Sequence, residues 1–121
     1  MKVLVVNDDP GFVKSAVKHL RKAGLDVDGI VRRALGQTTP DGNLLDKKES
    51  LALVHGADVI FLDHNMPGMN GDKMLEYWQK EGIDIASKRV VGTSADPQPY
   101  LKEQYEGRMN EVGRVKRLLG L

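Results

Sequence analysis

Short apolar runs alternate with amphipathic stretches along this chain. Strand-type apolar runs fall at about 2–7, 26–32, 57–62 and 89–93. A helical pattern covers about 10–23, where Asp9 suits the N-cap and Pro10 the first helical position. A second helical pattern runs from Lys73 to Lys80. This alternation predicts an α/β fold with a doubly wound parallel sheet, covered by helices on both faces.

The segment between the second and third predicted strands is longer than one crossover helix needs. Residues 36–43 are polar and rich in turn formers, so they are interpreted as an inserted loop. A helix is predicted to follow at about 44–54. The loop leaves the carboxyl end of a strand, so it is either a tolerated surface insertion or a lid or partner contact.

The C-terminal segment shows helical periodicity. Its apolar residues recur at steps of three and four: Leu101, Tyr105, Met109, Val112, Val115 and Leu119. We predict that about 97–119 is mainly helical and covers the open edge of the strand at 89–93. Partial cover of that edge would favour a homodimer.

Two predicted strands run directly into carboxylates. Asp8 and Asp9 follow the first strand, and Asp63 follows the third. The carboxyl ends of parallel strands meet at one edge of an open sheet. Carboxylates gathered there repel one another unless a cation lies among them, and oxygen ligands suit Mg²⁺. The pattern therefore predicts a magnesium site, although Asp9 could instead only cap the following helix.

Three segments, in order, resemble the signatures of response-regulator receiver domains, the CheY-like phosphoacceptors of two-component signalling. They are Val3–Pro10, Phe61–Gly71 and Arg89–Ala95. The resemblance covers residues 2–31 and 56–96 and implies a flavodoxin/CheY-like sheet.

The resemblance implies a role for several of these residues. Asp63 would be the phosphoacceptor, with Asp8, Asp9 and the backbone carbonyl of Asn65 holding Mg²⁺ together with it. Ser94 would supply a hydroxyl to the phosphoryl group, or Thr93 would do so if the register is shifted by one residue.

The chain departs from this family after Asp96. A standard receiver continues through a fifth strand ending in Lys-Pro, and no run after Asp96 looks like a buried strand. We therefore expect four parallel strands in the order 2-1-3-4, without the fifth. Receiver domains typically carry a lysine at the end of the fifth strand. Two residues could correspond to it here, Lys102 and Lys116, and neither lies in the sequence context that is usual for that lysine.

Composition bears on the number of domains and on the classes of partner. The 121 residues suit a single domain over 1–121, and 18 basic against 17 acidic residues give no signal for nucleic acid. The chain has no cysteine, and its N-terminal apolar run is too short for a signal peptide or membrane span. We therefore expect a soluble, cytoplasmic protein that binds neither nucleic acid nor membrane.

The expected function is that of a stand-alone receiver in a phosphorelay. Its expected partners are a sensor histidine kinase or phosphotransfer protein and a downstream protein. It would not be an enzyme beyond self-phosphorylation and self-dephosphorylation. The alternative is a pseudo-receiver that binds partners independently of phosphorylation.

Overall fold

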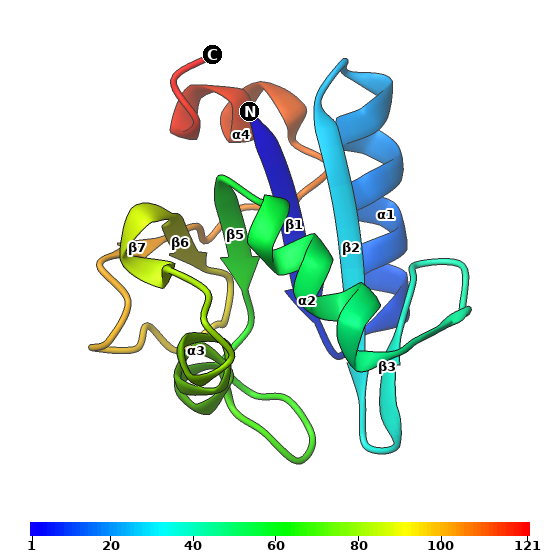
Figure 1. Cartoon of the computed structure of the whole chain (residues 1–121). Helices are drawn as coiled ribbons and strands as arrows, with labels where there is room; N and C mark the ends of the chain where they lie inside the picture. The colour runs from blue at the N-terminus through cyan, green and yellow to red at the C-terminus, as the bar shows by residue number, and fades with distance from the viewer.

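Seven strands form one sheet in the order β4-β3-β2-β1-β5-β6-β7 in the computed structural model, which describes residues 1–121 (Figure 1). The strands are β1 (Lys2–Asn7), β2 (Asp26–Arg33), β3 (Gly36–Thr38), β4 (Leu44–Leu45), β5 (Val59–Leu62), β6 (Arg89–Gly92) and β7 (Glu103–Gln104). The helices are α1 (Pro10–Lys22), α2 (Lys47–Gly56), α3 (Gly71–Lys80) and α4 (Val112–Leu118), with a 3-10 turn at Ile85–Ser87. No helix is both long and apolar enough to cross a membrane.

The central strands are parallel, as the sequence predicts. Strand β1 pairs with β2 on one side and with β5 on the other, and β6 continues the sheet beyond β5. Val5, for example, lies opposite Gly29 of β2 and Phe61 of β5. The parallel strands therefore end together, at what we call the carboxyl edge of the sheet.

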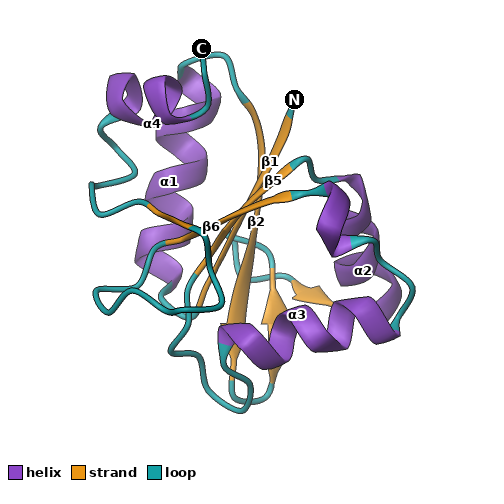
Figure 2. Ribbon diagram, turned by 90° about the vertical axis from the view of Figure 1, so that its left-hand side faces the viewer, coloured by secondary structure: helices purple, strands orange, loops and turns teal.

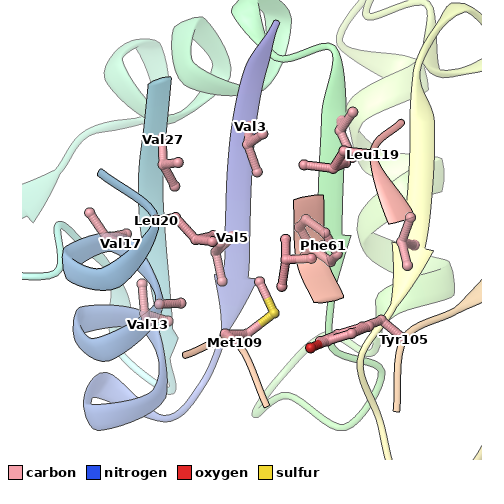
Figure 3. Packing of buried hydrophobic residues seen from close by; sticks show 14 of the residues in the cluster. Val3, Val5, Val13, Val17, Leu20, Val27, Phe61, Tyr105, Met109 and Leu119 are labelled. Atoms are coloured by element: carbon pink, nitrogen blue, oxygen red, sulfur yellow. The ribbon is translucent and has the colours of Figure 1, made fainter. Parts of the chain in front are cut away.

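Helices cover both faces of this sheet. Helices α1 and α4 lie on one face, and α2 and α3 lie on the other (Figure 2). Alternate residues of β1 serve two cores: Val3 and Val5 pack under α1, whereas Leu4 and Val6 pack towards α3. Figure 3 shows the first core, in which Phe61 and Tyr105 lie beside Met109. Burial on both faces explains why β1 has a continuous apolar run.

The insertion is a β-extension of the sheet and not a plain loop. Strand β3 pairs antiparallel with the end of β2, and β4 pairs antiparallel with β3. Leu44 and Leu45 thus belong to a strand, so the helix predicted at 44–54 begins only at Lys47. The reason is local, because Asp46 and Glu49 form a reciprocal capping box that starts α2 there.

The prediction of one long C-terminal helix without a fifth strand was wrong. Strand β7 pairs in parallel with β6 through Val91–Glu103 and Gly92–Gln104, and the N–H of Tyr105 donates to the Gly92 carbonyl at 2.8 Å. The parallel order is therefore 2-1-3-4-5 when these strands are numbered along the chain. Pairing with the open edge of β6 satisfies backbone groups that would otherwise stay exposed, which outweighs the local helical period.

The apolar stripe of the C-terminal segment is nevertheless buried. Four of its six members lie in the core under α1, contributed by the residues after β7 and by the α4 region: Tyr105, Met109, Val115 and Leu119. The helical period therefore identified buried residues correctly, although these residues come from a loop and from the region of a short helix.

Candidate functional site

Asp63 lies immediately after β5, at the carboxyl edge, where its side chain is half-buried. The backbone N–H of Asp63 donates to the Val6 carbonyl at 3.0 Å, which fixes the residue beside the end of β1. The hydroxyl of Ser94 donates to Asp63 Oδ1 at 2.7 Å. The backbone N–H of His64 in turn donates to Ser94 Oγ at 2.6 Å. The carboxylate therefore has a fixed orientation.

The environment of Asp63 disfavours a negative charge. Burial raises the pKa of the Asp63 carboxyl above its usual value, and the nearby Asp8 carboxylate raises this pKa further. The hydrogen bonds from Ser94 and from the His64 backbone oppose the shift. Asp8 and Asp63 thus face each other closely enough to interact, as the sequence predicted for the ends of neighbouring strands.

Asp9 performs the capping role that the sequence left open. Its Oδ1 accepts hydrogen bonds from the N–H groups of Gly11, at 2.9 Å, and Phe12, at 3.3 Å, at the start of α1. The carboxylates of Asp8, Asp9 and Asp63 do not come together as a cluster of three metal-binding side chains. Asp8 and Asp63 still present facing oxygen donors, and the Asn65 carbonyl accepts no backbone hydrogen bond. This donor set fits Mg²⁺, which binds few protein ligands and keeps several waters.

The structure brings Ser94, and not Thr93, to Asp63. Ser94 is buried and its hydroxyl bonds to the carboxylate, whereas Thr93 Oγ1 is buried with no hydrogen-bond partner. Alternation along the strand places the two side chains on opposite sides. The side chain of Gln104, at the end of β7, also donates to the Ser94 carbonyl. The fifth strand therefore helps to hold the Ser94 backbone.

Neither candidate lysine lies at the carboxyl edge. Lys102 precedes β7, so it stands at the opposite end of a parallel strand, in a groove that Lys88 also lines. Lys116 belongs to α4, which lies near the N-terminus of the chain, away from the strand ends (Figure 1). The structure thus does not bring either ammonium group to Asp63.

Tyr100 is a site residue that the sequence analysis missed. Its hydroxyl lies 2.8 Å from Nδ1 of His64, and the two ring centroids are 5.5 Å apart. Burial raises the pKa of Tyr100 to about 12, and the charges of Asp72 and Asp63 contribute. No sequence signal marks this contact, because it joins loops that follow two different strands. It links the residue after Asp63 to the segment between β6 and β7.

Gly71→Ala is expected to disturb this contact and to destabilise the fold by about 1–3 kcal/mol. An added Cβ would overlap the Tyr100 hydroxyl and would lie 2.9 Å from the Asp63 carbonyl oxygen. The carbonyl is backbone and cannot move aside cheaply. Urea unfolding measures the loss, and the nuclear magnetic resonance signals of the His64 ring report the contact.

Gly56→Ala is the matched control, because nothing lies within 4 Å of a Cβ at that position. We expect it to be neutral or slightly stabilising, since alanine restricts the unfolded chain. Equal losses in the two variants would contradict the steric explanation.

Comparisons with known proteins give similarity to response regulators. No protein-family model matches the chain. The chain is 37% identical over 79 residues, 64% of its length, to the two-component response regulator ARR11 of Arabidopsis thaliana. It is equally similar over 79 residues to the response regulator ORR26 of Oryza sativa subsp. japonica. The chain spans only 13% and 12% of the length of these two curated relatives.

Solved structures show the same fold over nearly the whole chain. A CheY-like receiver domain from Methylobacillus flagellatus aligns with a TM-score of 0.67 at 16% identity, covering 99% of this chain and 96% of that one. The chemotaxis protein CheY4 of Vibrio cholerae aligns with a TM-score of 0.63 at 18% identity, covering 96% of each chain. The sequence and structure comparisons together support one class, a response-regulator receiver domain of two-component signalling with a CheY-like fold.

Proposed function

We propose that this chain is a phosphoacceptor that carries a phosphoryl group on Asp63 in a reaction that depends on Mg²⁺. The donor would be a phosphohistidine on a sensor kinase or phosphotransfer protein, and the phosphorylated form would act by binding a downstream protein. The observation that carries the proposal is the placement of Asp63, oriented by Ser94 and facing Asp8 at the carboxyl edge.

In the proposed transfer, a carboxylate oxygen of Asp63 attacks the phosphorus atom. The new oxygen–phosphorus bond forms as the nitrogen–phosphorus bond of the donor breaks, and the donor imidazole leaves. Ser94 holds Oδ1, so Oδ2 is the free attacking oxygen. The same hydroxyl can then donate to the phosphoryl group. Asp8, Asp63 and the Asn65 carbonyl would hold Mg²⁺, which would neutralise charge on the phosphoryl oxygens.

The second candidate is the pseudo-receiver, a module that binds partners regardless of phosphorylation. The observation that favours it is the position of Lys102 and Lys116, neither of which lies beside Asp63. The presence of β7 weakens the pseudo-receiver hypothesis, because this fifth parallel strand supports the Ser94 backbone. We expect no catalytic activity beyond self-phosphorylation and self-dephosphorylation in either case.

Binding of beryllofluoride, a phosphoryl analogue, separates the two candidates. We expect the chain to bind it only with Mg²⁺, because the analogue adds negative charge beside Asp8 and Asp63. Nuclear magnetic resonance would show the largest shifts at the backbone of His64 and Ser94. A solved structural neighbour, the receiver domain of DrrB, is described as activated by this analogue; it aligns with a TM-score of 0.62 at 15% identity.

The control variant is Asp41→Asn, which removes an exposed carboxylate in the loop between β3 and β4. It should bind the analogue like the unmodified chain, whereas Asp63→Asn should not bind it. Identical spectra with and without the analogue at saturating Mg²⁺ would favour the pseudo-receiver.

A further inference from the structure

Arg32 is a cation at the carboxyl edge without a partner. It stands one residue beyond the Asn7–Val31 pair, at the level of Asp8 on the neighbouring strand. It takes part in no ion pair within the chain. Its Nε is buried and has no hydrogen-bond partner.

The guanidinium group of Arg32 extends towards the loop that follows Asp63. Its Nη2 lies 3.8 Å from the position that a Cβ on Gly68 would take. Gly68 has a φ of +77°, a conformation that favours glycine, so the close approach and the turn both suit this residue. Figure 1 shows the β2–β3 hairpin and the loop after β5 side by side, both projecting beyond the end of β1. The side chain therefore lies between these two projections.

The buried Nε of Arg32 is a hydrogen-bond donor without an acceptor, which needs a physical explanation. Burying an N–H without a partner is unfavourable, so such groups are rare unless another state satisfies them. The planar guanidinium presents donors in a fork that matches phosphoryl oxygens. A phosphoryl group on Asp63 would bring such oxygens to the edge of the sheet where Arg32 stands.

Charge balance also favours a contact between Arg32 and a phosphoryl group on Asp63. Phosphorylation adds negative charge to an edge that already carries Asp8 and Asp63. Neither Lys102 nor Lys116 lies there to offset it. Arg32 is held in place by the extension of the sheet, since it pairs with Gln37 of β3. The insertion would thus serve the site by fixing this arginine.

We propose that Arg32 binds the phosphoryl group carried by Asp63 and supplies the cation that neither candidate lysine provides. This assignment rests on the proposed phosphoacceptor function. It makes Arg32 a phosphoryl-binding residue that comes from β2, two strands away from Asp63.

The test compares Arg32→Gln with Arg33→Gln. Arg33 is the exposed next residue, and alternation along β2 directs its side chain to the other face. We expect Arg32→Gln to weaken beryllofluoride binding at saturating Mg²⁺ about tenfold or more, as for loss of a charge-assisted hydrogen bond. Arg33→Gln should bind within about twofold of the unmodified chain, and Arg32→Lys should recover part of the affinity.

Mg²⁺ affinity without the analogue distinguishes a direct role from a structural one. Removing a nearby cation should leave Mg²⁺ binding unchanged or tighter in Arg32→Gln, whereas distortion of the edge would weaken it. Analogue binding that is unchanged in Arg32→Gln would overturn this assignment and leave the phosphoacceptor proposal intact. If the unmodified chain binds no analogue with Mg²⁺, both proposals fail together. If Arg32→Gln does not fold, the same measurements are made on Arg32→Lys. Weakened Mg²⁺ binding in Arg32→Lys would overturn the assignment.

Discussion

Asp63→Asn is expected to abolish phosphoryl incorporation from acetyl phosphate and Mg²⁺. An amide oxygen is not a nucleophile of the required strength, and no other carboxylate at this edge is oriented by a hydroxyl as Asp63 is by Ser94. Intact-mass measurement should show one phosphoryl group on the unmodified chain and none on the variant. Trapping with sodium borohydride would then locate the modified residue.

Asp8→Asn is the matched control for this experiment, since it removes the neighbouring carboxylate and keeps the acceptor. We expect it to retain Asp63 as the only modified residue, with a reaction that responds more weakly to Mg²⁺. Modification that persists in Asp63→Asn would show that another residue accepts the group, and the assignment of Asp63 would then be wrong.

The same Asp63→Asn variant should be more stable than the unmodified chain at neutral pH. Burial raises the folded-state pKa of Asp63, so the stabilising contribution of its protonated form is present at low pH. That contribution is lost as the pH rises through the raised pKa. The gain should be on the order of 1 kcal/mol or less, because the group is half-exposed and water screens its charge. Urea unfolding at acid and neutral pH should show the gain only at neutral pH.

Phe61→Ala is expected to lower the free energy of unfolding by about 3–5 kcal/mol. Phe61 is fully buried on β5, two residues before the proposed acceptor. Its ring meets that of Tyr105 edge to face, at 6.2 Å between centroids and 70° between planes (Figure 3). Truncation would leave a cavity between β5 and the segment after β7. Urea unfolding followed by circular dichroism measures the loss.

Phe12→Ala provides the comparison, because Phe12 is the other phenylalanine and lies only partly buried against the same core. Its loss should be clearly smaller, since less apolar area returns to water. Equal destabilisation by the two substitutions would indicate that the Phe61–Tyr105 region is not the centre of this core.

The sequence by itself determined the central parallel strands, the first helix and the place of the acidic residues. Each of these depends on local pattern. Buried parallel strands show as apolar runs, and Asp9 with Pro10 marks the start of a helix from the chain alone. Asp8 and Asp63 follow strands that proved to be neighbours, so topology brought them together as expected.

Only the tertiary structure decided the short strands and the contacts between loops. Strands β4 and β7 have two residues each, too few to show a period, and they exist because a neighbouring edge offers hydrogen bonds. Only the structure shows that the hydroxyl of Ser94, and not that of Thr93, bonds to the Asp63 carboxylate. The contact of Tyr100 with His64, and the approach of Arg32 to Gly68, join residues 36 apart in each case along the chain. Such pairs leave no local pattern, because their geometry is set by how the strands are ordered in the sheet.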